Sequence, residues 1–388
     1  MSAVMSDAQP NWPVVPLSGL LRRAPRYGIN AAAVEFSIVD YDYIRITDID
    51  QDGRFTPHPK VSVRHPSAGS YVLAIGELVF ARTGASVGKS YLYDPRDGKL
   101  VYAGFLINIA PDTHLLNPKY LSLVAQTQSY WDWVARTSVR SGQPGINSRE
   151  YAQMLIQLPD IQTQNVIALA ATDADELIAA LVRLITKKQE IKQGMMQQLL
   201  TGRIRLPGFA DQWSEAQLGD VLTVKHGKSQ KAIESLSGRY PILATGGEIG
   251  RTNTALYSKP SVLIGRKGTI DRPQYQATPF WTVDTLFYTE ISAVADPKFL
   301  YYVFTTIDWR SMNEASGVPS LSSSRVEGVP VSLPSLQEQR AIRQVIDDAE
   351  VEIAVLLGRL TKTKVVKRGM MQELLTGRTR LPVEEGAA

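Results

Sequence analysis

The stretch KQGMMQQLLTGRIRLP at residues 192–207 decides the fold, because it returns as KRGMMQELLTGRTRLP at 367–382. Only three aligned pairs differ between the two copies, which are Gln193 and Arg368, Gln198 and Glu373, and Ile204 and Thr379. The register that aligns Lys192 with Lys367 also relates three further pairs of short motifs upstream, namely Leu158-Pro159 and Leu333-Pro334, Gln162-x-Gln164 and Gln337-x-Gln339, and Gly142-x-Pro144 and Gly317-x-Pro319. A repeat of this size indicates that the chain contains two copies of one structural plan.

The two copies differ in length, and the difference lies in their front parts. Asn117-Pro118-Lys119-Tyr120-Leu121 matches Asp296-Pro297-Lys298-Phe299-Leu300, and Trp12 with Leu17 matches Trp213 with Leu218. The register therefore shifts inside the front parts and becomes constant only from the Gly-x-Pro motifs onward. A constant frame that carries two divergent front domains favours two different binding surfaces on one scaffold.

The constant parts predict two long helices. Residues 160–201 follow a Leu-Pro pair, contain no proline and end at Gly202, which is a common helix stop. Apolar residues recur along two lines in each copy, at steps of seven residues with one last step of fourteen. The lines are Ile167, Ala174, Leu181 and Met195 with Ala171, Ile178, Ile185 and Leu199, and then Ile342, Ala349, Leu356 and Met370 with Ile346, Ile353, Leu360 and Leu374. This pattern predicts a coiled-coil seam. Each helix of roughly 40 residues would be about 60 Å long, and an antiparallel pair with pseudo-two-fold symmetry would place the front domains at opposite ends.

We therefore divide the chain into a first front domain, a first helix segment, a second front domain, a second helix segment and a tail, at residues 1–158, 159–207, 208–333, 334–382 and 383–388. The front domains mix short apolar runs with Gly, Pro, Asn and Asp, which predicts α/β domains with many loops. The predicted strands include Tyr43–Ile46, Tyr71–Ile75, Val262–Ile264 and Thr285–Tyr288. Short helices are predicted at Asn117–Trp133 and Pro297–Met312.

Two loops in each front domain combine basic residues, small polar residues and glycine. Residues 80–89 and 263–269 each follow a strand-like run and place an arginine beside a turn, and residues 140–147 and 316–320 form the second loop pair. Arginine is the commonest reader of guanine, and Asn and Gln pair with adenine. The candidate DNA-binding residues are Arg45, Thr47, Asp48, Arg82, Thr83, Ser86, Lys89, Arg140, Gln143, Asn147, Lys228, Thr245, Arg266, Lys267 and Ser320.

Composition and local motifs give no support for an enzyme. The chain has 388 residues, 44% of them hydrophobic, a net charge of +4, no cysteine and four scattered histidines, so a thiolate site and a zinc site are not expected. Gly84-Ala85-Ser86-Val87-Gly88-Lys89-Ser90 has three residues between its glycines where a phosphate-binding loop needs four. Asn117-Pro118 and Asp296-Pro297 are interpreted as helix caps rather than as a methyltransferase loop. Asp175 and Glu190-Ile191-Lys192 match a loose nuclease spacing but lie within a predicted helix.

The sequence also bears on location. The first residues, MSAVMSDAQPNWP, lack a basic region followed by an apolar stretch, so no secretory leader is expected. No run of about 18 apolar residues is present, so no transmembrane helix is expected. We expect the protein in the cytoplasm.

The duplicated frame, the QxQ helix starts and the GMMQxLLTGR-x-RLP ends resemble the specificity subunit of type I restriction–modification enzymes. Tyr43-Ile44-Arg45-Ile46-Thr47-Asp48-Ile49 is similar to the first motif of its target-recognition domains. The resemblance covers nearly the whole chain, and it is weaker in the second front domain around Pro241–Gly247. It implies two target-recognition domains that each read half of a split, asymmetric site in double-stranded DNA. It also implies a non-catalytic chain whose helices set the spacer and bind two modification subunits.

The cofactors implied by this resemblance belong to the partners. S-adenosylmethionine would bind the modification subunits, ATP and magnesium would bind the restriction subunits, and this chain would hold none. The repeated helix ends are either a charged helix stop or a docking surface presented twice. The residues of this expected docking surface are Met195, Leu199, Arg203, Met370, Leu374 and Arg378.

Three alternatives remain open at the level of sequence. One is the specificity subunit of a related fused methyltransferase–nuclease system, or an orphan subunit. Another is a coiled-coil scaffold that binds proteins through its two front domains. The third is an enzyme, which a bound cofactor or turnover by the isolated chain would favour. Salt-dependent binding of duplex DNA separates the scaffold from the DNA-reading subunit.

Overall fold

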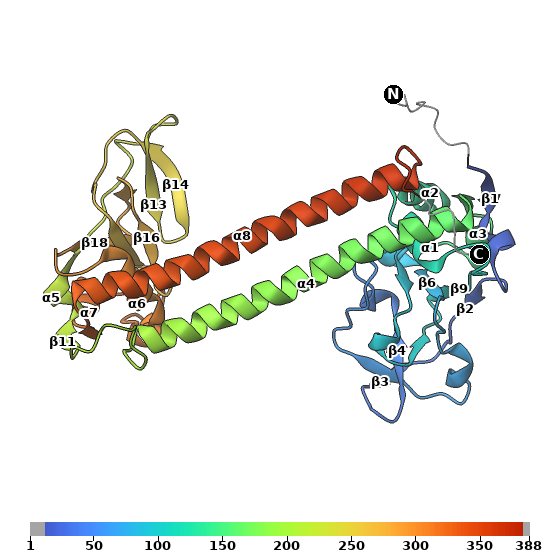
Figure 1. Ribbon diagram of the computed structural model, residues 1–388, viewed down its shortest axis with the longest axis horizontal. Coiled ribbons are helices and arrows are strands. Elements are labelled where there is room, and N and C mark those ends of the chain that lie inside the picture. Colours follow the sequence, from blue (N-terminus) through green and yellow to red (C-terminus); the bar gives the residue numbers. More distant parts are fainter. Residues whose placement is uncertain (1–11, 383–388) are drawn as a thin grey trace. The chain divides into compact units, whose positions relative to one another are not determined.

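The computed structural model describes residues 12–382, so the predicted tail at 383–388 lies outside the described residues. The chain forms two compact units (Figure 1). Unit 1 comprises Met1–Ala180 and Leu360–Ala388, and unit 2 comprises Leu181–Arg359. Each unit therefore combines one front domain with the first part of one long helix and the last part of the other.

The two long helices form as predicted. Helix α4 spans Ile161–Leu199 and helix α8 spans Leu336–Leu375, each without interruption. Both end at a glycine in the left-handed region, with φ of 68° at Gly202 and 70° at Gly377. The residue two positions after each glycine donates a backbone hydrogen bond back into the helix. This duplicated stop explains why the TGRxR sequence occurs in both copies.

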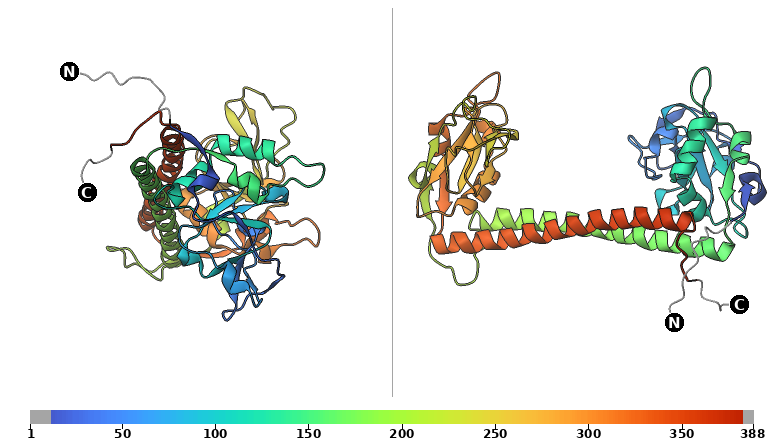
Figure 2. Two further views of the ribbon diagram at one scale, coloured as in Figure 1. Left: turned by 90° about the vertical axis from the view of Figure 1, so that its right-hand side faces the viewer. Right: turned by 90° about the horizontal axis from the view of Figure 1, so that it is seen from above.

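The helix segments pair in antiparallel fashion within each unit. In unit 1, Ile167 and Ala171 near the start of α4 share a core with Leu374 near the end of α8. In unit 2, Leu199 near the end of α4 shares a core with Ile342 near the start of α8. The predicted seam is confirmed, because ten of its sixteen positions are buried and the other six are half-buried. In each unit the strands lie on one side of the paired helix segments (Figure 2).

In the described part of the first front domain, residues 12–158, unit 1 has three sheets and three short α-helices. Its strands are β1 (Val14–Pro16), β2 (Arg26–Tyr27), β3 (Ala33–Glu35), β4 (Tyr41–Ile44), β5 (Val61–Val63), β6 (Leu78–Ala81), β7 (Ser90–Leu92), β8 (Leu100–Tyr102), β9 (Leu106–Ile109) and β10 (Leu155–Gln157). Its helices are α1 (Pro118–Val124), α2 (Gln128–Thr137) and α3 (Ser148–Ala152). The strand orders are β2-β9-β6-β7, β3-β5-β4-β8 and β1-β10.

Unit 2 has the corresponding parts. Its strands are β11 (Ser214–Gln217), β12 (Leu222–Lys225), β13 (Tyr240–Ala244), β14 (Gly247–Thr252), β15 (Ser261–Gly265), β16 (Gln274–Gln276), β17 (Trp281–Thr282), β18 (Leu286–Ile291) and β19 (Pro330–Leu333). Its short helices are α5 (Leu218–Val221), α6 (Pro297–Thr306) and α7 (Ser323–Glu327). The strand orders are β12-β18-β15-β16, β14-β13-β17 and β11-β19.

The two units share one topology. The sheet β2-β9-β6-β7 corresponds to β12-β18-β15-β16, and all neighbours in both are antiparallel. In the second sheet, β4 is parallel to β8 and antiparallel to β5, just as β13 is parallel to β17 and antiparallel to β14. The third sheet pairs the first strand of each front domain with its last. The α/β class and the two-copy plan are therefore confirmed.

Several local predictions need correction. Residues 71–75 are not a strand, because Ala68–Tyr71 is a 3-10 helix and only Val72 makes an isolated bridge, to Val101. The helix predicted at Asn117–Trp133 is two helices, α1 and α2, separated by a turn at residues 125–127. Among the strands, β4 ends at Ile44, two residues earlier than predicted. Within residues 12–382, none of the helices combines the length and the apolar character needed to cross a membrane.

Candidate nucleic-acid interface

The two loops singled out in the first front domain lie side by side. Backbone hydrogen bonds join them, since Gly84 N donates to Pro144 O over 3.0 Å and Ile146 N donates to Arg82 O over 2.8 Å. Thr83 forms an isolated antiparallel bridge with Gly145. The loops are far apart in the sequence, yet they form one paired structure, which we call the paired loop of unit 1.

The second front domain builds the same structure from different residues. Gly268 N donates to Pro319 O over 2.8 Å, Leu321 N donates to Arg266 O over 3.0 Å, and Lys267 bridges Ser320. We call this the paired loop of unit 2. Gly84 and Gly268 both have a positive φ, 71° and 88°, so the same turn is required in both units. The recurrence seen in the sequence therefore reflects one backbone frame used twice.

Arg82 is the basic side chain at the centre of the paired loop of unit 1. Its guanidinium lies over the ring of Tyr27 in β2, with its carbon 4.8 Å from the ring centre. The Arg82 Nε is buried without a hydrogen-bond partner in residues 12–382. The Tyr27 oxygen accepts a hydrogen bond from Ser148 N at 3.1 Å, so Tyr27 is itself held by α3. Tyr27 was not predicted, because no local signal could reveal a partner so distant from Arg82 in the sequence.

Arg266 occupies the matching position in unit 2. It has no aromatic platform among residues 12–382, and its Nη1 donates to Asp284 O at 3.3 Å. Lys267 is exposed, and Ser320 is half-buried. The remaining two predicted residues of this front domain differ in placement. The hydroxyl of Thr245 lies beside Gly268, 3.9 Å from the position that a Cβ would take there. Lys228 is exposed, and its backbone N and O bond with Thr282 O and with the Trp281 side chain.

The predicted readers at the start of the chain have structural roles. Asp48 is buried and accepts two hydrogen bonds from the Arg45 guanidinium, at 2.9 and 2.7 Å. It also accepts from Arg45 N at 2.8 Å. We therefore correct the assignment of Asp48 as a DNA contact, since its carboxylate is enclosed and neutralised. Thr47 is exposed, and Arg45 is partly exposed with its charge paired.

Arg140 and Asn147 also serve the protein itself. Asn147 caps α3 by accepting from Glu150 N, and the Glu150 carboxylate accepts from Asn147 N and from Arg140. Both residues therefore help to build the start of α3, and their assignment as base readers stays a prediction. The sequence carries the signal for this, since an Asn followed three residues later by a Glu is a capping box.

The other predicted residues around the paired loop of unit 1 have mixed placements. Gln143 is exposed, with its amide close to Gly84. Thr83 Oγ1 donates to Pro144 O at 3.4 Å, and Ser86 ends a 3-10 helix. Lys89 Nζ donates to Ile49 O at 3.0 Å, so its ammonium is held inside the front domain. Arg82, Thr83 and Gln143 therefore lie together in the paired loop of unit 1, whereas the Lys89 ammonium bonds to the backbone of Ile49.

The QxQ motif attaches each front domain to its helix. Gln164 is fully buried; its Oε1 accepts from Asn117 N at 2.9 Å, and its Nε2 donates to Leu115 O and Pro159 O. Gln339 makes the same bonds in unit 2, accepting from Asp296 N at 2.8 Å and donating to Val294 O and Pro334 O. The capping prediction for Asn117 and Asp296 is confirmed, because each side chain accepts from two backbone amides of the following helix.

A second duplicated contact joins three helices by charge. In unit 1, Asp175 of α4 pairs with Lys119 of α1 at 2.9 Å and with Lys367 of α8 at 2.5 Å. Burial raises the pKa of Asp175, but hydrogen bonds from Lys367 and Lys119 outweigh it and hold the pKa below its ordinary value. Asp175 therefore lies within α4, as its interpretation as a helix residue expects, and its carboxylate links α4 to α1 and α8.

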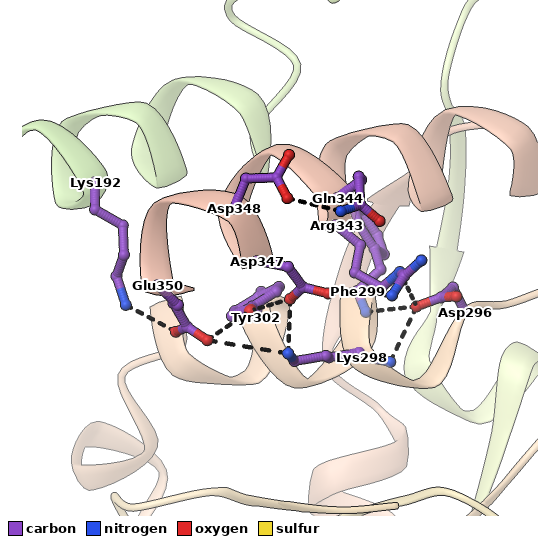
Figure 3. Close-up of polar contacts among 10 residues, drawn as sticks. All are labelled: Lys192, Asp296, Lys298, Phe299, Tyr302, Arg343, Gln344, Asp347, Asp348 and Glu350. Carbon is purple, nitrogen blue, oxygen red and sulfur yellow. Dashed lines mark hydrogen bonds and ion pairs between the residues drawn. The ribbon is translucent and has the colours of Figure 1, made fainter. Parts of the chain in front are cut away.

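Unit 2 repeats this contact with the helices exchanged (Figure 3). Glu350 of α8 pairs with Lys192 of α4 at 2.8 Å and lies 4.0 Å from Lys298 of α6. Asp347 adds an ion pair with Lys298 at 2.7 Å, and Tyr302 donates to both carboxylates. Since Asp175 aligns with Glu350 in the same register that aligns Lys192 with Lys367, the charge contact obeys the internal symmetry of the sequence.

The expected docking residues divide into two groups. Leu199 and Leu374 are buried in the cores of units 2 and 1, and Met195 and Met370 pack against the same cores while partly buried. We correct the assignment of Leu199 and Leu374, because their side chains are buried between the front domains and the helices. Arg203 is exposed, and Arg378 is about half exposed and lies 3.8 Å from Glu373. The docking assignment of the two methionines and the two arginines stays a prediction.

Comparisons with known proteins agree with this architecture. Residues 210–360 match the family model of the type I restriction modification DNA specificity domain. A putative type I restriction enzyme MjaX specificity subunit from Methanocaldococcus jannaschii is 22% identical over 352 residues, which are 82% of this chain and 82% of that protein. The EcoDI specificity subunit from Escherichia coli is 20% identical over 166 residues, which are 42% of this chain and 37% of that protein.

Two solved structures have the same fold. An S subunit of a type I restriction-modification system from M. genitalium matches with a TM-score of 0.61 and 17% identity, over 94% of this chain and 96% of that one. The HsdS subunit from Thermoanaerobacter tengcongensis matches with a TM-score of 0.53 and 16% identity, over 98% and 100% of the two chains. The fold of front domains on paired helices is therefore shared across nearly the full length.

Proposed function

We propose that this chain is a member of the type I restriction–modification specificity family and that each of its front domains reads one half of a split, asymmetric site in double-stranded DNA. The observation that supports this proposal most strongly is the paired loop, which the two units build with identical backbone bonding and different side chains. Thr83 beside Gly145 in unit 1 corresponds to Lys267 beside Ser320 in unit 2. A common frame with different exposed groups suits two readers of different sequences.

The attachment of the front domains supports a division of labour. Each front domain is fixed to both long helices by a buried glutamine and a charge contact that occur once per unit. Rigid attachment limits the loss of conformational entropy when two weak half-site contacts are made together. The continuous helices α4 and α8 would then determine the number of base pairs between the half-sites.

Catalysis belongs to partner subunits in this proposal. Two modification subunits with S-adenosylmethionine would methylate adenine, and restriction subunits with ATP and magnesium would cleave. Arg203 and Arg378 stand at equivalent places beyond the ends of α4 and α8 and are exposed. Because they occur once in each unit, they suit the recruitment of two copies of one acidic partner surface.

Mapping modified adenines by long-read sequencing tests the proposal. A host that expresses this chain with its modification subunits should methylate a motif made of two short half-sites separated by unspecified bases. Removal of the chain should abolish methylation at that motif while leaving the modification subunits in place. A motif that persists without the chain, or a single continuous motif, contradicts the proposal.

A further inference from the structure

Many arginines of the first front domain form ion pairs with carboxylates of the same domain. Arg22, Arg23, Arg45, Arg64, Arg96 and Arg140 each form an ion pair with a carboxylate at 3.7 Å or less. Within residues 12–382, no carboxylate lies within 4.0 Å of the Arg82 guanidinium, and its backbone alone makes hydrogen bonds. Arg82 is therefore a full positive charge held at the surface with its donors unused.

The side chain of Arg82 is nevertheless held in one orientation. Its guanidinium carbon lies over the Tyr27 ring, 4.8 Å from the ring centre, and its Nε is buried. Its backbone N donates to Phe105 O, and its backbone O accepts from Ile146 N. Stacking of a guanidinium on an aromatic ring fixes its plane without using its N–H groups. The outer edge of the plane then presents two parallel donors, which is the arrangement that pairs with O6 and N7 of guanine.

We propose that Arg82, held on the Tyr27 platform, reads a guanine in the DNA half-site recognised by the first front domain. This inference rests on the proposed function and adds to it the identity of one base and of the residue that reads it. A phosphate contact requires charge alone and is satisfied by a mobile lysine. A stacked and bound guanidinium adds directional specificity that a phosphate does not need.

The platform is specific to the first front domain. Arg266 has the same place on the backbone frame, but its guanidinium donates to Asp284 O and has no stacked ring among the described residues. Arg266→Ala therefore serves as a matched control, since it removes the equivalent charge from the other reader. It should weaken recognition of the second half-site only.

The test uses the full chain assembled with its modification subunits and duplexes that contain the methylated motif found by sequencing. Each guanine of the first half-site is replaced in turn by 7-deazaguanine, which lacks the N7 acceptor. The wild-type assembly should lose affinity at one position, by part of the about 5- to 150-fold of a bidentate contact, because O6 still accepts one bond. Arg82→Ala removes both bonds, so it should lose the larger amount on unmodified DNA and show no further loss with 7-deazaguanine at that position.

Three variants separate base reading from simpler roles. Arg82→Lys keeps the charge and should still lose the discrimination at that guanine. Tyr27→Phe keeps the ring and should bind within about twofold of the wild type, whereas Tyr27→Ala should lose most of the guanine discrimination. Thermal unfolding of each variant shows whether the first front domain stays folded. If the alanine variants do not fold, the two conservative single variants, Arg82→Lys and Tyr27→Phe, still test the inference.

The outcomes distinguish the inference from the function beneath it. The inference is overturned if the affinity loss caused by Arg82→Ala and the loss caused by 7-deazaguanine are additive at every guanine of the first half-site. Additive losses mean that Arg82 contacts none of those guanines. A uniform loss over all sequences, with a smaller salt dependence and full rescue by lysine, also overturns it in favour of a phosphate contact. Absence of any sequence preference in the wild-type assembly contradicts the proposed function itself.

Discussion

Replacing Gln164 by leucine removes three hydrogen bonds that join the first front domain to α4. The substitution keeps most of the side-chain volume but leaves Asn117 N, Leu115 O and Pro159 O without their partner in a site where Gln164 is fully buried. An orphaned buried polar group costs about 1–3 kcal/mol. Because the three groups share one site and can relax together, we expect a total loss of about 2–5 kcal/mol from the stability of unit 1.

Hydrogen exchange followed by mass spectrometry measures this loss where it occurs. A local loss of about 2 kcal/mol corresponds to roughly 30-fold faster exchange, and it should appear in peptides that cover residues 115–124 and 157–164. Peptides of unit 2 should be unchanged. Gln339→Leu should give the mirror result, with faster exchange around Val294 and Asp296, because it makes the equivalent three bonds.

Gln162→Leu is the matched control, because Gln162 is exposed and belongs to the same QxQ motif. A surface substitution of this kind changes stability by about 0.5 kcal/mol or less. Equal effects of Gln162→Leu and Gln164→Leu would refute the reasoning, since they would show that the buried amide bonds do not hold the front domain.

Three further predictions concern charge, length and partners. The folded state holds the pKa of Asp175 below its ordinary value, so this carboxylate stabilises the fold above about pH 3.9, and that stabilisation is lost as the pH falls through the folded-state pKa. Acid unfolding followed by circular dichroism should therefore show a steeper loss of stability in the wild type than in Asp175→Asn. Identical profiles of the two proteins would contradict this. Insertion of four residues after Lys187, with a matching turn beside Glu352, lengthens each helix by about 6 Å and should add about two base pairs to the spacer of the methylated motif; an unchanged spacer would rule out the helices as its ruler. Arg203→Glu and Arg378→Glu should each remove one modification subunit from the assembly in native mass spectrometry, and full occupancy in the double variant would exclude both arginines from docking.

The long helices could be predicted from sequence because their signals are local and repeated. The seven-residue spacing of Ile167, Ala174 and Leu181 indicates a buried stripe along the helix. Gly202 and Gly377 mark the C-terminal ends of the two helices. The short apolar run at 71–75 misled, because a preceding 3-10 turn and Gly76 with φ of 82° interrupt any strand there. Short runs carry too little periodicity to separate a strand from a loop.

The site was predictable as a pair of loops and less so as a set of side chains. The recurrence of residues 82–84 and 266–268 with their partner loops identified the frame that the structure brings together. The roles of single residues depend on non-local partners, as Tyr27 does for Arg82. The sequence does carry two local signals of such roles. The capping box of Asn147 indicates the start of α3, and the shared register of Asp175 and Glu350 indicates the duplicated charge contact.

Photo-crosslinking from equivalent points of the two paired loops tests most directly whether one frame presents two independent readers. Gln143 and Val318 each precede the proline whose carbonyl accepts a hydrogen bond from the glycine of the paired loop, Gly84 or Gly268, and both are exposed. A photo-reactive residue at 143 should crosslink to one half-site of the methylated motif, and the same residue at 318 should crosslink to the other. Crosslinks from both positions to the same half-site, or to DNA outside the motif, would contradict the account.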